Sequence, residues 1–327
     1  MIRKRKKEMK INLHDIFLAH QRIKDFTIKT PLMYSDSLSL LSESEIWLKL
    51  ENLQKTGSFK IRGALNKITL LNEAEKKNGV ITASAGNHAQ GVALASQYFG
   101  VLAKVVVPKD TPETKKNSIK KLGAELIVHG ANYDEAELHA YRLSEKLGMT
   151  FIHAFEDKDV ISGQGTIGLE FLLENPNFDM ILVPAGGGGL ISGIAIAAKS
   201  INPKIKVIGI QSEASPPWYY SFKAKELVDV TYKKSIADGL HGGIGKENLT
   251  LALNYIDDFV LVTEKEIEKA MSWLATEYHY MIEGSGAVGI AAILNKKIDV
   301  KNKKVLNVIS GGNVDARVLA NIIRTHG

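Results

Sequence analysis

The chain has 327 residues, of which 45% are hydrophobic and 24% charged, a composition typical of a globular protein with a sizeable core. It contains no cysteine, which excludes disulfides, thiolate nucleophiles and zinc–thiolate sites. No apolar run approaches the roughly 20 residues of a membrane span. We therefore expect no membrane partner and a cytoplasmic location.

The formal net charge of +6 is concentrated in one short segment. Residues 1–10 hold six Lys or Arg and one Glu, which leaves the rest of the chain nearly neutral. A basic arm of this kind can contact nucleic acid, but a frayed terminus, or a start at Met9, explains it more simply. It is not a signal peptide, because no apolar stretch of about 7–15 residues follows the charges. We expect no nucleic-acid partner.

Short apolar runs rich in β-branched residues alternate with longer amphipathic segments, which predicts parallel sheets covered by helices, the α/β class. The predicted strands are Gly79–Ala83, Ala103–Val107, Leu126–His129, Met180–Pro184, Val207–Gln211, Asp258–Val262 and Val305–Ile309. The predicted helices between them include Pro112–Leu122, Asp134–Leu147, Leu190–Lys199 and Thr263–Tyr280. Pro112, after Thr111, suits a first helical position, and Thr263 with Glu266 forms a capping-box pattern.

Three strand–helix units between about Asn72 and Leu147 look like a compact doubly wound block. The chain on both sides of this block would build a second, larger sheet. We therefore predict two doubly wound open sheets, with residues 1–70 and 150–327 in a large domain and residues 71–149 in a small one. Ligands in such folds lie where the carboxyl ends of strands meet the amino ends of helices.

Lys60 follows the small-residue turn Thr56-Gly57-Ser58 and opens an amphipathic stretch that starts like a helix. The apolar ring of Phe59 beside it favours partial removal from water. Desolvation lowers the pKa of an ammonium group and makes the free amine a nucleophile or a base. Alone the pattern is weak, because most lysines are solvated surface charges.

Four glycines, Gly186–Gly189, connect the apolar run Met180–Pro184 to a helix-like stretch that begins at Leu190. Glycines let the backbone approach an anion closely, and a helix start directs free N–H groups and a positive dipole end towards it. The segment therefore predicts a phosphate site, with a flexible turn as the alternative. No Gly-Lys-Ser/Thr follows, which excludes a Walker-type nucleotide loop.

A literal G-x-G-x-x-G occurs at Gly284–Gly289, but it follows a helical pattern where a dinucleotide fingerprint needs a strand. Close packing of the backbone against a neighbouring element explains these glycines equally well. We predict no NAD binding here.

The segment Ser84–His88 closes a predicted strand and opens a helix. The backbone N–H groups at the helix start, with the hydroxyl of Ser84 and the side-chain amide of Asn87, could bind a carboxylate. N-capping of the helix by Ser84 or Asn87 is the alternative. We leave His88 out of catalysis, because a lone histidine is more often structural.

The segment Ser310–Asn313 follows the strand that ends at Ile309. Ser310 could cap a helix. It could also donate a hydrogen bond to a ring nitrogen of a ligand bound in the crevice at the carboxyl ends of the strands.

Together these segments resemble the serine/threonine dehydratase family of pyridoxal phosphate (PLP) enzymes, which have the tryptophan synthase β fold, fold type II. The similarity runs from about Leu13 to the C-terminus. Four motifs carry it in the family's order: residues 55–64 (KTGSFKIRGA), 83–91 (ASAGNHAQG), 186–193 (GGGGLISG) and 310–313 (SGGN). Any one of these motifs is weak, whereas four in order are specific.

The resemblance implies that the large domain binds PLP in the interdomain cleft and that the small domain binds the substrate carboxylate. Lys60 would carry PLP as a Schiff base and then remove the substrate's Cα proton. Backbone N–H groups would hold the phosphate, Asn87 would bond the phenolic oxygen, and Ser310 would face the pyridine nitrogen. The expected cofactor-binding residues are Lys60, Phe59, Asn87, Gly186, Gly187, Gly188, Gly189, Leu190, Gly239 and Ser310, of which Phe59 and Gly239 would flank the ring. The expected substrate-binding residues are Ser84, Ala85, Asn87 and His88.

The implied activity is that of a threonine/serine ammonia-lyase, which converts L-threonine or L-serine by β-elimination to 2-oxobutanoate or pyruvate plus ammonia. A neutral Ser310 at the pyridine nitrogen gives a weaker electron sink than a carboxylate partner would, and so favours rapid loss of the β-hydroxyl over transamination. The alternative is a dehydratase or racemase acting on another β-hydroxy amino acid, such as 3-hydroxyaspartate or serine. A PLP-binding module without catalytic activity is a more distant alternative.

Two departures from the family pattern bear on these alternatives. Ala85 stands where serine racemases of this family carry a serine that acts as acid and base, which disfavours racemisation. The family's cation site often pairs a Glu with a nearby Asp, whereas residues 211–218 contain Glu213 as their one acid. We therefore predict no metal site.

The chain ends soon after Asn313, so we expect no C-terminal regulatory domain and no feedback by isoleucine, as in a catabolic or short-form dehydratase. We also expect a homo-oligomer, a dimer or a tetramer. The aromatic cluster Trp218–Tyr220, if exposed, would indicate a subunit contact.

Overall fold

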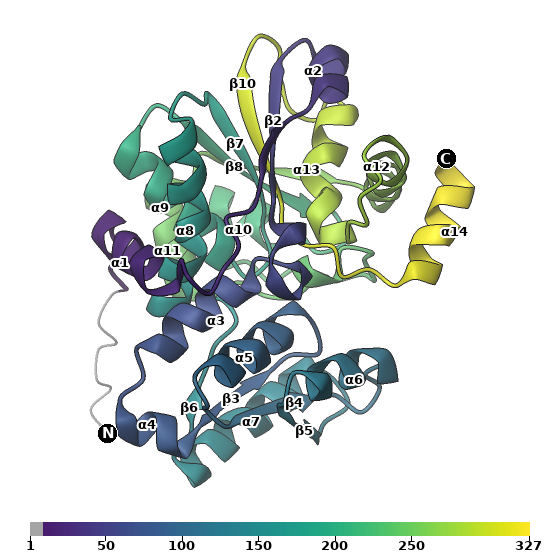
Figure 1. Cartoon of the computed structure of the whole chain (residues 1–327). Coiled ribbons are helices and arrows are strands. Elements are labelled where there is room, and N and C mark those ends of the chain that lie inside the picture. The colour runs from purple at the N-terminus through teal and green to yellow at the C-terminus, as the bar shows by residue number, and fades with distance from the viewer. Residues whose placement is uncertain (1–8) are drawn as a thin grey trace.

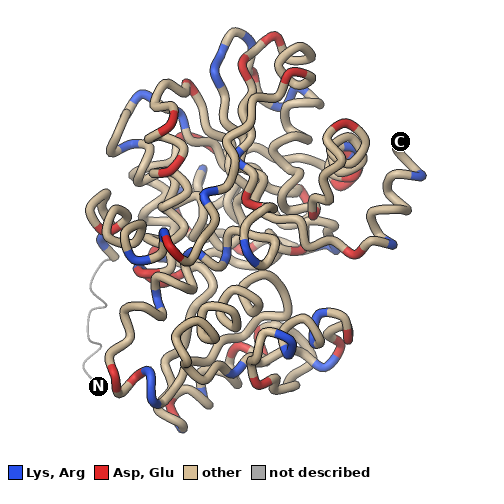
Figure 2. Tube along the Cα trace, in the orientation of Figure 1, with Lys and Arg blue, Asp and Glu red and all other residues tan. Residues whose placement is uncertain are grey.

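Two sheets organise the protein, one in the upper and one in the lower part of Figure 1, with helices on both faces of each. The structure is a computed structural model and describes residues 9–327. The predicted basic arm therefore lies almost wholly outside the described residues. Basic and acidic residues are interspersed over both parts (Figure 2), in keeping with the near neutrality of the chain beyond residue 10.

The upper sheet has six strands in the order β1-β2-β10-β7-β8-β9, and all neighbours are parallel except β1 and β2. Its strands are β1 (Leu32–Tyr34), β2 (Glu45–Leu50), β7 (Met180–Pro184), β8 (Lys206–Ser212), β9 (Asp258–Val262) and β10 (Lys304–Ile309). Every residue of β7 is buried, as expected for a central parallel strand covered on both faces.

Helices cover both faces of this sheet and enclose two apolar cores. One face carries α8 (Lys158–Glu174), α9 (Gly189–Ile201), α10 (Pro217–Ala224) and α11 (Lys246–Tyr255), with α1 (Leu13–Ile23) packed on α8. The other carries α2 (Asp36–Ser42), α12 (Glu264–Glu277), α13 (Gly284–Leu294) and α14 (Ala316–His326). No helix among residues 9–327 is both long enough and apolar enough to span a membrane.

The lower sheet has four parallel strands in the order β5-β4-β3-β6. They are β3 (Val80–Ala83), β4 (Ala103–Val107), β5 (Glu125–Val128) and β6 (Thr150–Phe151). The accompanying helices are α3 (Lys60–Thr69), α4 (Glu73–Asn78), α5 (Asn87–Tyr98), α6 (Glu113–Lys121) and α7 (Tyr133–Leu147). Helix α3 packs on α5 of the lower part and on α8 of the upper part, so it lies at their junction (Figure 1).

All seven predicted strands are present, each with ends within one residue of the prediction. The capping box of Thr263 and Glu266 is confirmed, although its helix ends earlier than predicted, at Glu277. Pro112 is the N-cap residue of α6 and not its first helical residue, because its ψ of 142° is still extended. Strand β6 pairs with β3, so the small sheet extends beyond the predicted boundary at residue 149. The division into two domains stays a prediction.

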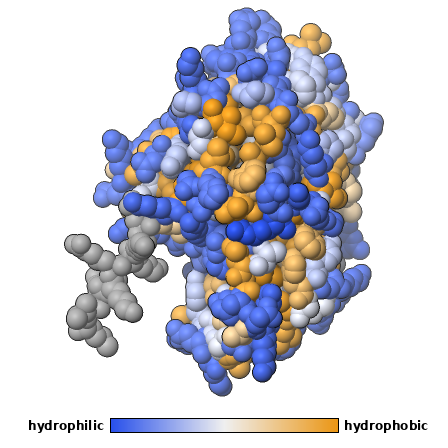
Figure 3. All heavy atoms as spheres, turned by 60° about the vertical axis from the view of Figure 1, so that its left-hand side comes forward, coloured by the Kyte–Doolittle hydropathy of each residue, from blue (hydrophilic) through white to orange (hydrophobic). Residues whose placement is uncertain are grey.

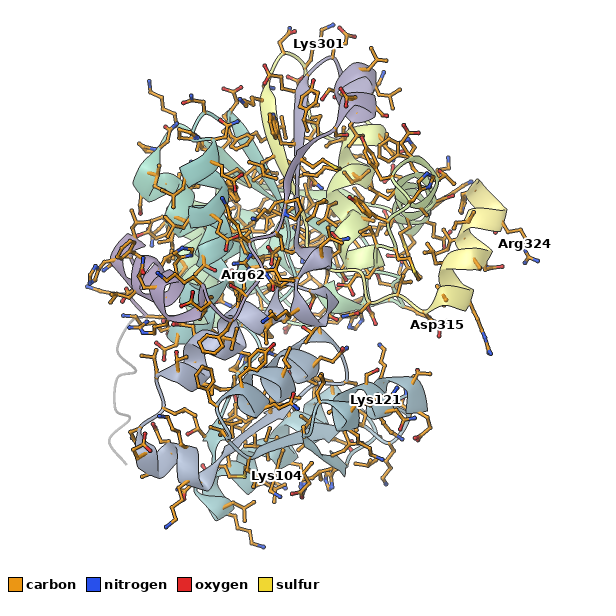
Figure 4. The ribbon with its side chains drawn as sticks, in the orientation of Figure 1. Arg62, Lys104, Lys121, Lys301, Asp315 and Arg324 are labelled. Atoms are coloured by element: carbon orange, nitrogen blue, oxygen red, sulfur yellow. The ribbon has the colours of Figure 1, made fainter. Side chains whose placement is uncertain are left out.

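A buried network of charged side chains fixes helix α3. Arg62 donates to both carboxylate oxygens of Glu51 and to both of Glu170, at 2.6–2.9 Å. Lys49 donates to Glu170 at 2.9 Å and to the Thr30 carbonyl at 2.8 Å. In Figure 4, Arg62 lies in the interior where α3 meets the upper part, whereas Lys301 and Arg324 lie at the periphery. Because the network joins α3 to β2 and α8, it holds the start of α3 in place.

Candidate active site

Lys60 is the first residue of α3 and is partly buried. Its Nζ donates to the carbonyl of Ala154 at 3.0 Å and lies 5.2 Å from the centroid of the Phe59 ring. Removal from water lowers the pKa of Lys60 to about 8, although the negative charge of Glu283 partly opposes this shift. The uncharged amine is therefore far more populated near neutral pH than in an ordinary lysine, which suits a nucleophile or a base.

The start of α3 is attached to the carboxyl end of β10. The N–H of Phe59 donates to the carbonyl of Ser310 at 3.1 Å, and Ser58 forms an antiparallel β-bridge with Gly311. Ser310 is buried and follows β10 directly. The interpretation of Ser310 as a helix cap is wrong, because the next helix, α14, begins at Ala316 and is capped by Asp315.

The glycine loop, Gly186–Gly189, joins β7 to α9, as predicted. A Cβ on Gly187 would collide with the ring of Phe155, and Gly188 has a φ of +101°, a region that favours glycine. No described residue accepts a hydrogen bond from the N–H groups between Gly186 and Ile191. With the positive end of the α9 dipole behind them, these groups fit a phosphate. Leu190, the second residue of α9, is buried.

Gly239 lies in a short 3-10 helix, Asp238–Leu240, next to the glycine loop. A Cβ on Gly186 would lie 2.9 Å from the carbonyl oxygen of Gly239. On its other side, a Cβ on Gly239 would lie 2.8 Å from Oγ of Ser285, a buried hydroxyl without a described hydrogen-bond partner. The structure thus brings Gly239 and Gly186, which are far apart in the sequence, to the same edge of the site.

The segment Ser84–His88 joins β3 to α5. The N-cap residue of α5 is Gly86, and the Oγ of Ser84 accepts from the N–H of Gly86 at 3.2 Å without reaching the helix. The capping interpretation is therefore wrong. The N–H groups of Asn87 and His88 have no described acceptor, so the amino end of α5 is open to an anion. Ala85, half-buried, lies within this segment.

Helices α3 and α5 cross closely where Gly91 meets Lys60. A Cβ on Gly91 would lie only 3.1 Å from the carbonyl carbon of Lys60. A larger residue would push the two helix starts apart. Gly91 therefore keeps the open end of α5 close to Lys60.

His88 is buried on α5 and packs towards the end of β6. Its Nε2 lies 3.0 Å from the carbonyl of Ile152, and a neutral ring donates there. Burial, together with the nearby charge of Lys60, lowers the pKa of His88 to about 3. A histidine that stays neutral over the physiological range suits a structural role.

Glu283 is a site residue that the sequence does not reveal. Both of its carboxylate oxygens accept from the side-chain amide of Asn87, at 2.9 and 3.0 Å. The oxygen of that amide accepts from Asn313 at 2.7 Å, and Asn313 also donates to the carbonyl of Thr56. Burial raises the pKa of Glu283 to about 7. A titratable carboxyl group therefore lies beside Asn87 and influences Lys60.

The glycines of the G-x-G-x-x-G pattern begin helix α13 and serve close packing, as predicted. A Cβ on Gly284 would lie 2.5 Å from the carbonyl oxygen of Ile236, and one on Gly286 would lie 2.8 Å from that of Gly311. A Cβ on Gly289 would collide with the side chain of Asn307. Gly286 in particular lets α13 approach the segment after β10, which includes Ser310.

Trp218 is not part of an exposed cluster. It is fully buried, and its indole stacks on Phe259 with ring centroids 5.1 Å apart. Tyr220 alone of the predicted cluster is well exposed, at 48%. Within residues 9–327, no three His, Asp or Glu side chains lie close enough together to hold a metal ion.

Comparison with known proteins identifies the family. The profile described as "Pyridoxal-phosphate dependent enzyme" matches residues 23–311. The chain belongs to this family. It is 49% identical over 314 residues to the L-threonine ammonia-lyase of Thermotoga maritima, covering 96% of this chain and 78% of the relative. It is 44% identical over 322 residues to L-threonine dehydratase catabolic TdcB of Staphylococcus aureus, covering 97% and 93%.

Solved structures agree with the fold. Maize serine racemase superposes with a TM-score of 0.91 at 35% identity, covering 96% of this chain and 97% of the racemase. Threonine deaminase isoform 2 of Solanum lycopersicum gives a TM-score of 0.90 at 35% identity, covering 98% and 96%. The resemblance to the PLP-dependent dehydratases and the two-sheet α/β fold are thus confirmed, and the family's cofactor is PLP.

Proposed function

We propose that this protein removes ammonia from L-threonine, L-serine or both by β-elimination, giving 2-oxobutanoate or pyruvate. The relatives named as threonine ammonia-lyase and threonine dehydratase support this proposal, since their identity of 44–49% extends over nearly the whole chain. The observation that carries it is Lys60, a partly buried amine with a lowered pKa. Its Nζ donates to the carbonyl of Ala154, next to the Phe155 ring that lies against Gly187. Its backbone lies against Gly91 of α5.

The residues around Lys60 fit PLP. The open N–H groups at the start of α9 match a phosphate, and the amine of Lys60 matches an aldehyde. Bound PLP would supply an electron sink for the negative charge that develops at the substrate's Cα. The residues that we propose to hold it are Lys60, Phe59, Asn87, Gly186, Gly187, Gly188, Gly189, Leu190, Gly239 and Ser310.

The protein's own groups would position the substrate and move its proton. The open amino end of α5, formed by Ser84, Ala85, Asn87 and the backbone N–H of His88, would hold the substrate carboxylate. The amine of Lys60 would accept the Cα proton, and its pKa of about 8 is close to the pH at which a general base is most effective. The carbonyl of Ala154 would orient that amine.

A racemase is the second candidate, because serine racemases are among the similar structures. Ala85 disfavours it, since a methyl group supplies no acid or base at that position. Action on a different β-hydroxy amino acid, such as 3-hydroxyaspartate, is the other alternative, and 2-oxo acid release from that substrate in place of L-threonine and L-serine would favour it.

We further propose a cytoplasmic homo-oligomer, a dimer or a tetramer, with a role in amino-acid catabolism. The absence of cysteine fits a reducing cytoplasm, and the word "catabolic" in the name of the Staphylococcus relatives supports the catabolic role. Apolar side chains gather on the face of the upper part seen in Figure 3, and such patches often mark subunit contacts. Light scattering of the purified protein would test the oligomeric state.

The proposed activity is tested by 2-oxo acid release from L-threonine and L-serine with cofactor-loaded protein. We expect release by the wild type and a loss on the order of 10³-fold or more in Lys60→Ala. Lys55→Ala is the matched control, because Lys55 lies five residues earlier and contacts the Tyr98 ring. Loaded wild type that releases no product from either substrate would contradict the proposed reaction. Borohydride reduction and peptide mapping would separately test whether PLP binds to Lys60.

A further inference from the structure

Three successive carbonyl groups, that of Ala185 just before the glycine loop and those of Gly186 and Gly187 within it, accept hydrogen bonds from buried side chains of other elements. Three elements, β8, α10 and α11, each contribute one donor. The bonds are Gln211 Nε2 to Ala185 O at 3.1 Å, Trp218 Nε1 to Gly186 O at 2.5 Å, and Asn248 Nδ2 to Gly187 O at 2.7 Å. All three donor residues are fully buried. We refer to Gln211, Trp218 and Asn248 below as the carbonyl clamp.

A run of glycines does not by itself determine which way its peptide groups point. Without Cβ atoms, each peptide plane can rotate and exchange its N–H for its C=O at small steric cost. A peptide group rotated in this way would direct its carbonyl oxygen at a bound anion and would repel it. Once a carbonyl is bonded on one side of the loop, the N–H of the same peptide group points to the opposite side.

We propose that the carbonyl clamp positions the glycine loop so that the N–H groups of Gly186, Gly187 and Gly188 face the phosphate of the cofactor. This inference rests on the proposed function, because it takes the phosphate of PLP as the ligand. It assigns positioning roles to residues that lie behind the loop. These residues do not touch the phosphate but orient the peptide groups that would bind it. The lack of a described acceptor for those N–H groups agrees with it.

Asn248 connects the loop to Lys60 as well. The same Nδ2 that bonds Gly187 donates to the carbonyl of Phe155 at 3.0 Å. The residue before Phe155 is Ala154, whose carbonyl accepts from Lys60. The buried side-chain amide of Asn248 therefore fixes the glycine loop relative to the Ala154–Phe155 segment that orients Lys60.

Gln211 and Trp218 act as a pair. The side-chain oxygen of Gln211 accepts from the backbone N–H groups of Trp218 and Tyr219, at 3.0 and 3.2 Å, and so holds the first turn of α10. The indole then lies between Phe259 and the loop, where a Cβ on Gly188 would collide with it. Loss of the Gln211 side chain would therefore release two donors, its own and that of Trp218.

The test compares Trp218→Phe and Asn248→Asp with matched controls. Trp218→Phe keeps an aromatic ring on Phe259 but removes the donor, and Trp273→Phe on α12 is its control. Asn248→Asp keeps the size but removes both donated bonds, and its control is Asn254→Asp on the same helix, where Asn254 bonds only within the helix, to Thr250. The readouts are the dissociation constant of PLP from absorbance titration and the ³¹P chemical shift of the bound phosphate.

We expect Trp218→Phe to bind PLP roughly tenfold more weakly, the effect of losing about one hydrogen bond to a buried acceptor. Asn248→Asp, which loses two donated bonds, should weaken PLP binding by at least as much, and both variants should change the ³¹P shift. Pyridoxal, which lacks the phosphate, should bind Trp218→Phe as it binds the wild type. Unchanged PLP affinity and ³¹P shift in both variants would overturn the inference, and so would equal weakening of PLP and pyridoxal in Trp218→Phe. Wild-type protein that takes up no PLP would instead overturn the proposed function on which the inference rests.

Discussion

Glu283 accepts from the side-chain amide of Asn87 through both of its carboxylate oxygens, at 2.9 and 3.0 Å, although 196 positions separate the two residues. With Asn313 bonded to the other end of the same amide, the orientation of Asn87 is fixed. The pair joins the amino end of α5 in the lower part to the start of α13 in the upper part. It therefore places an acid that titrates near neutral pH across the junction from Lys60.

Glu283→Gln removes a negative charge close to Lys60 while keeping the size of the side chain. Because the ionised carboxylate raises the pKa of Lys60, we expect the pKa in the variant to fall below its wild-type value of about 8. The pH dependence of Lys60 acetylation in cofactor-free protein, followed by peptide mapping, measures this shift. Glu73→Gln, at an exposed pair on α4, should leave the midpoint unchanged. An identical midpoint in Glu283→Gln and wild type would refute the coupling.

Arg62→Leu should destabilise the protein by about 3–5 kcal/mol, because it leaves the carboxylates of Glu51 and Glu170 buried with less positive charge. Urea unfolding of the variant and the wild type measures the free energy of unfolding. Lys67→Leu is the control on the same helix, where the ion pairs with Asp157 and Asp159 are partly exposed. We expect the control to lose about 1 kcal/mol or less. Equal losses in both variants would show that burial of the network is unimportant.

The sequence predicts those features of the site that local patterns carry. Met180–Pro184 is a continuous apolar run, and four successive glycines disfavour the interior of a helix or strand, so the strand and the turn that follows it are both predictable. Strands β1 and β6 have three and two residues, too few for a pattern to emerge. They exist because longer neighbours pair with them.

The rest of the site depends on contacts between distant segments. Glu283 and Asn248 look like ordinary surface residues in the sequence, and only the fold buries them next to Asn87 and Gly187. Trp218 follows two prolines within an aromatic cluster, which suggests an exposed surface. It is buried because the glycine loop, which has no side chains, leaves room for the indole.

Gly187→Ala should weaken PLP binding strongly, because the added methyl group collides with the ring of Phe155. The loop or the ring must then move, and movement of Phe155 also disturbs Ala154, the acceptor of Lys60. The dissociation constant of PLP measures the effect, which we expect to reach roughly tenfold or more, as for other overpacked sites. A double variant with Phe155→Ala provides the control. If the collision is the cause, the second substitution should restore part of the affinity, whereas purely additive losses would exclude it.

His88 should make the protein sensitive to acid. Its pKa is about 3 in the folded protein and near 6.5 when exposed, so between these values the unfolded chain binds more protons. The contribution of His88 to the free energy of unfolding therefore rises as the pH rises from about 3 to 6.5 and is lost on acidification. His88→Gln, which keeps a donor for the carbonyl of Ile152, should unfold at a lower pH than the wild type. His14→Gln, at an exposed position on α1, is the matched control and should unfold at the wild-type pH. Far-UV circular dichroism during acid titration distinguishes the three proteins, and coincident transitions would rule out His88 as a source of the acid sensitivity.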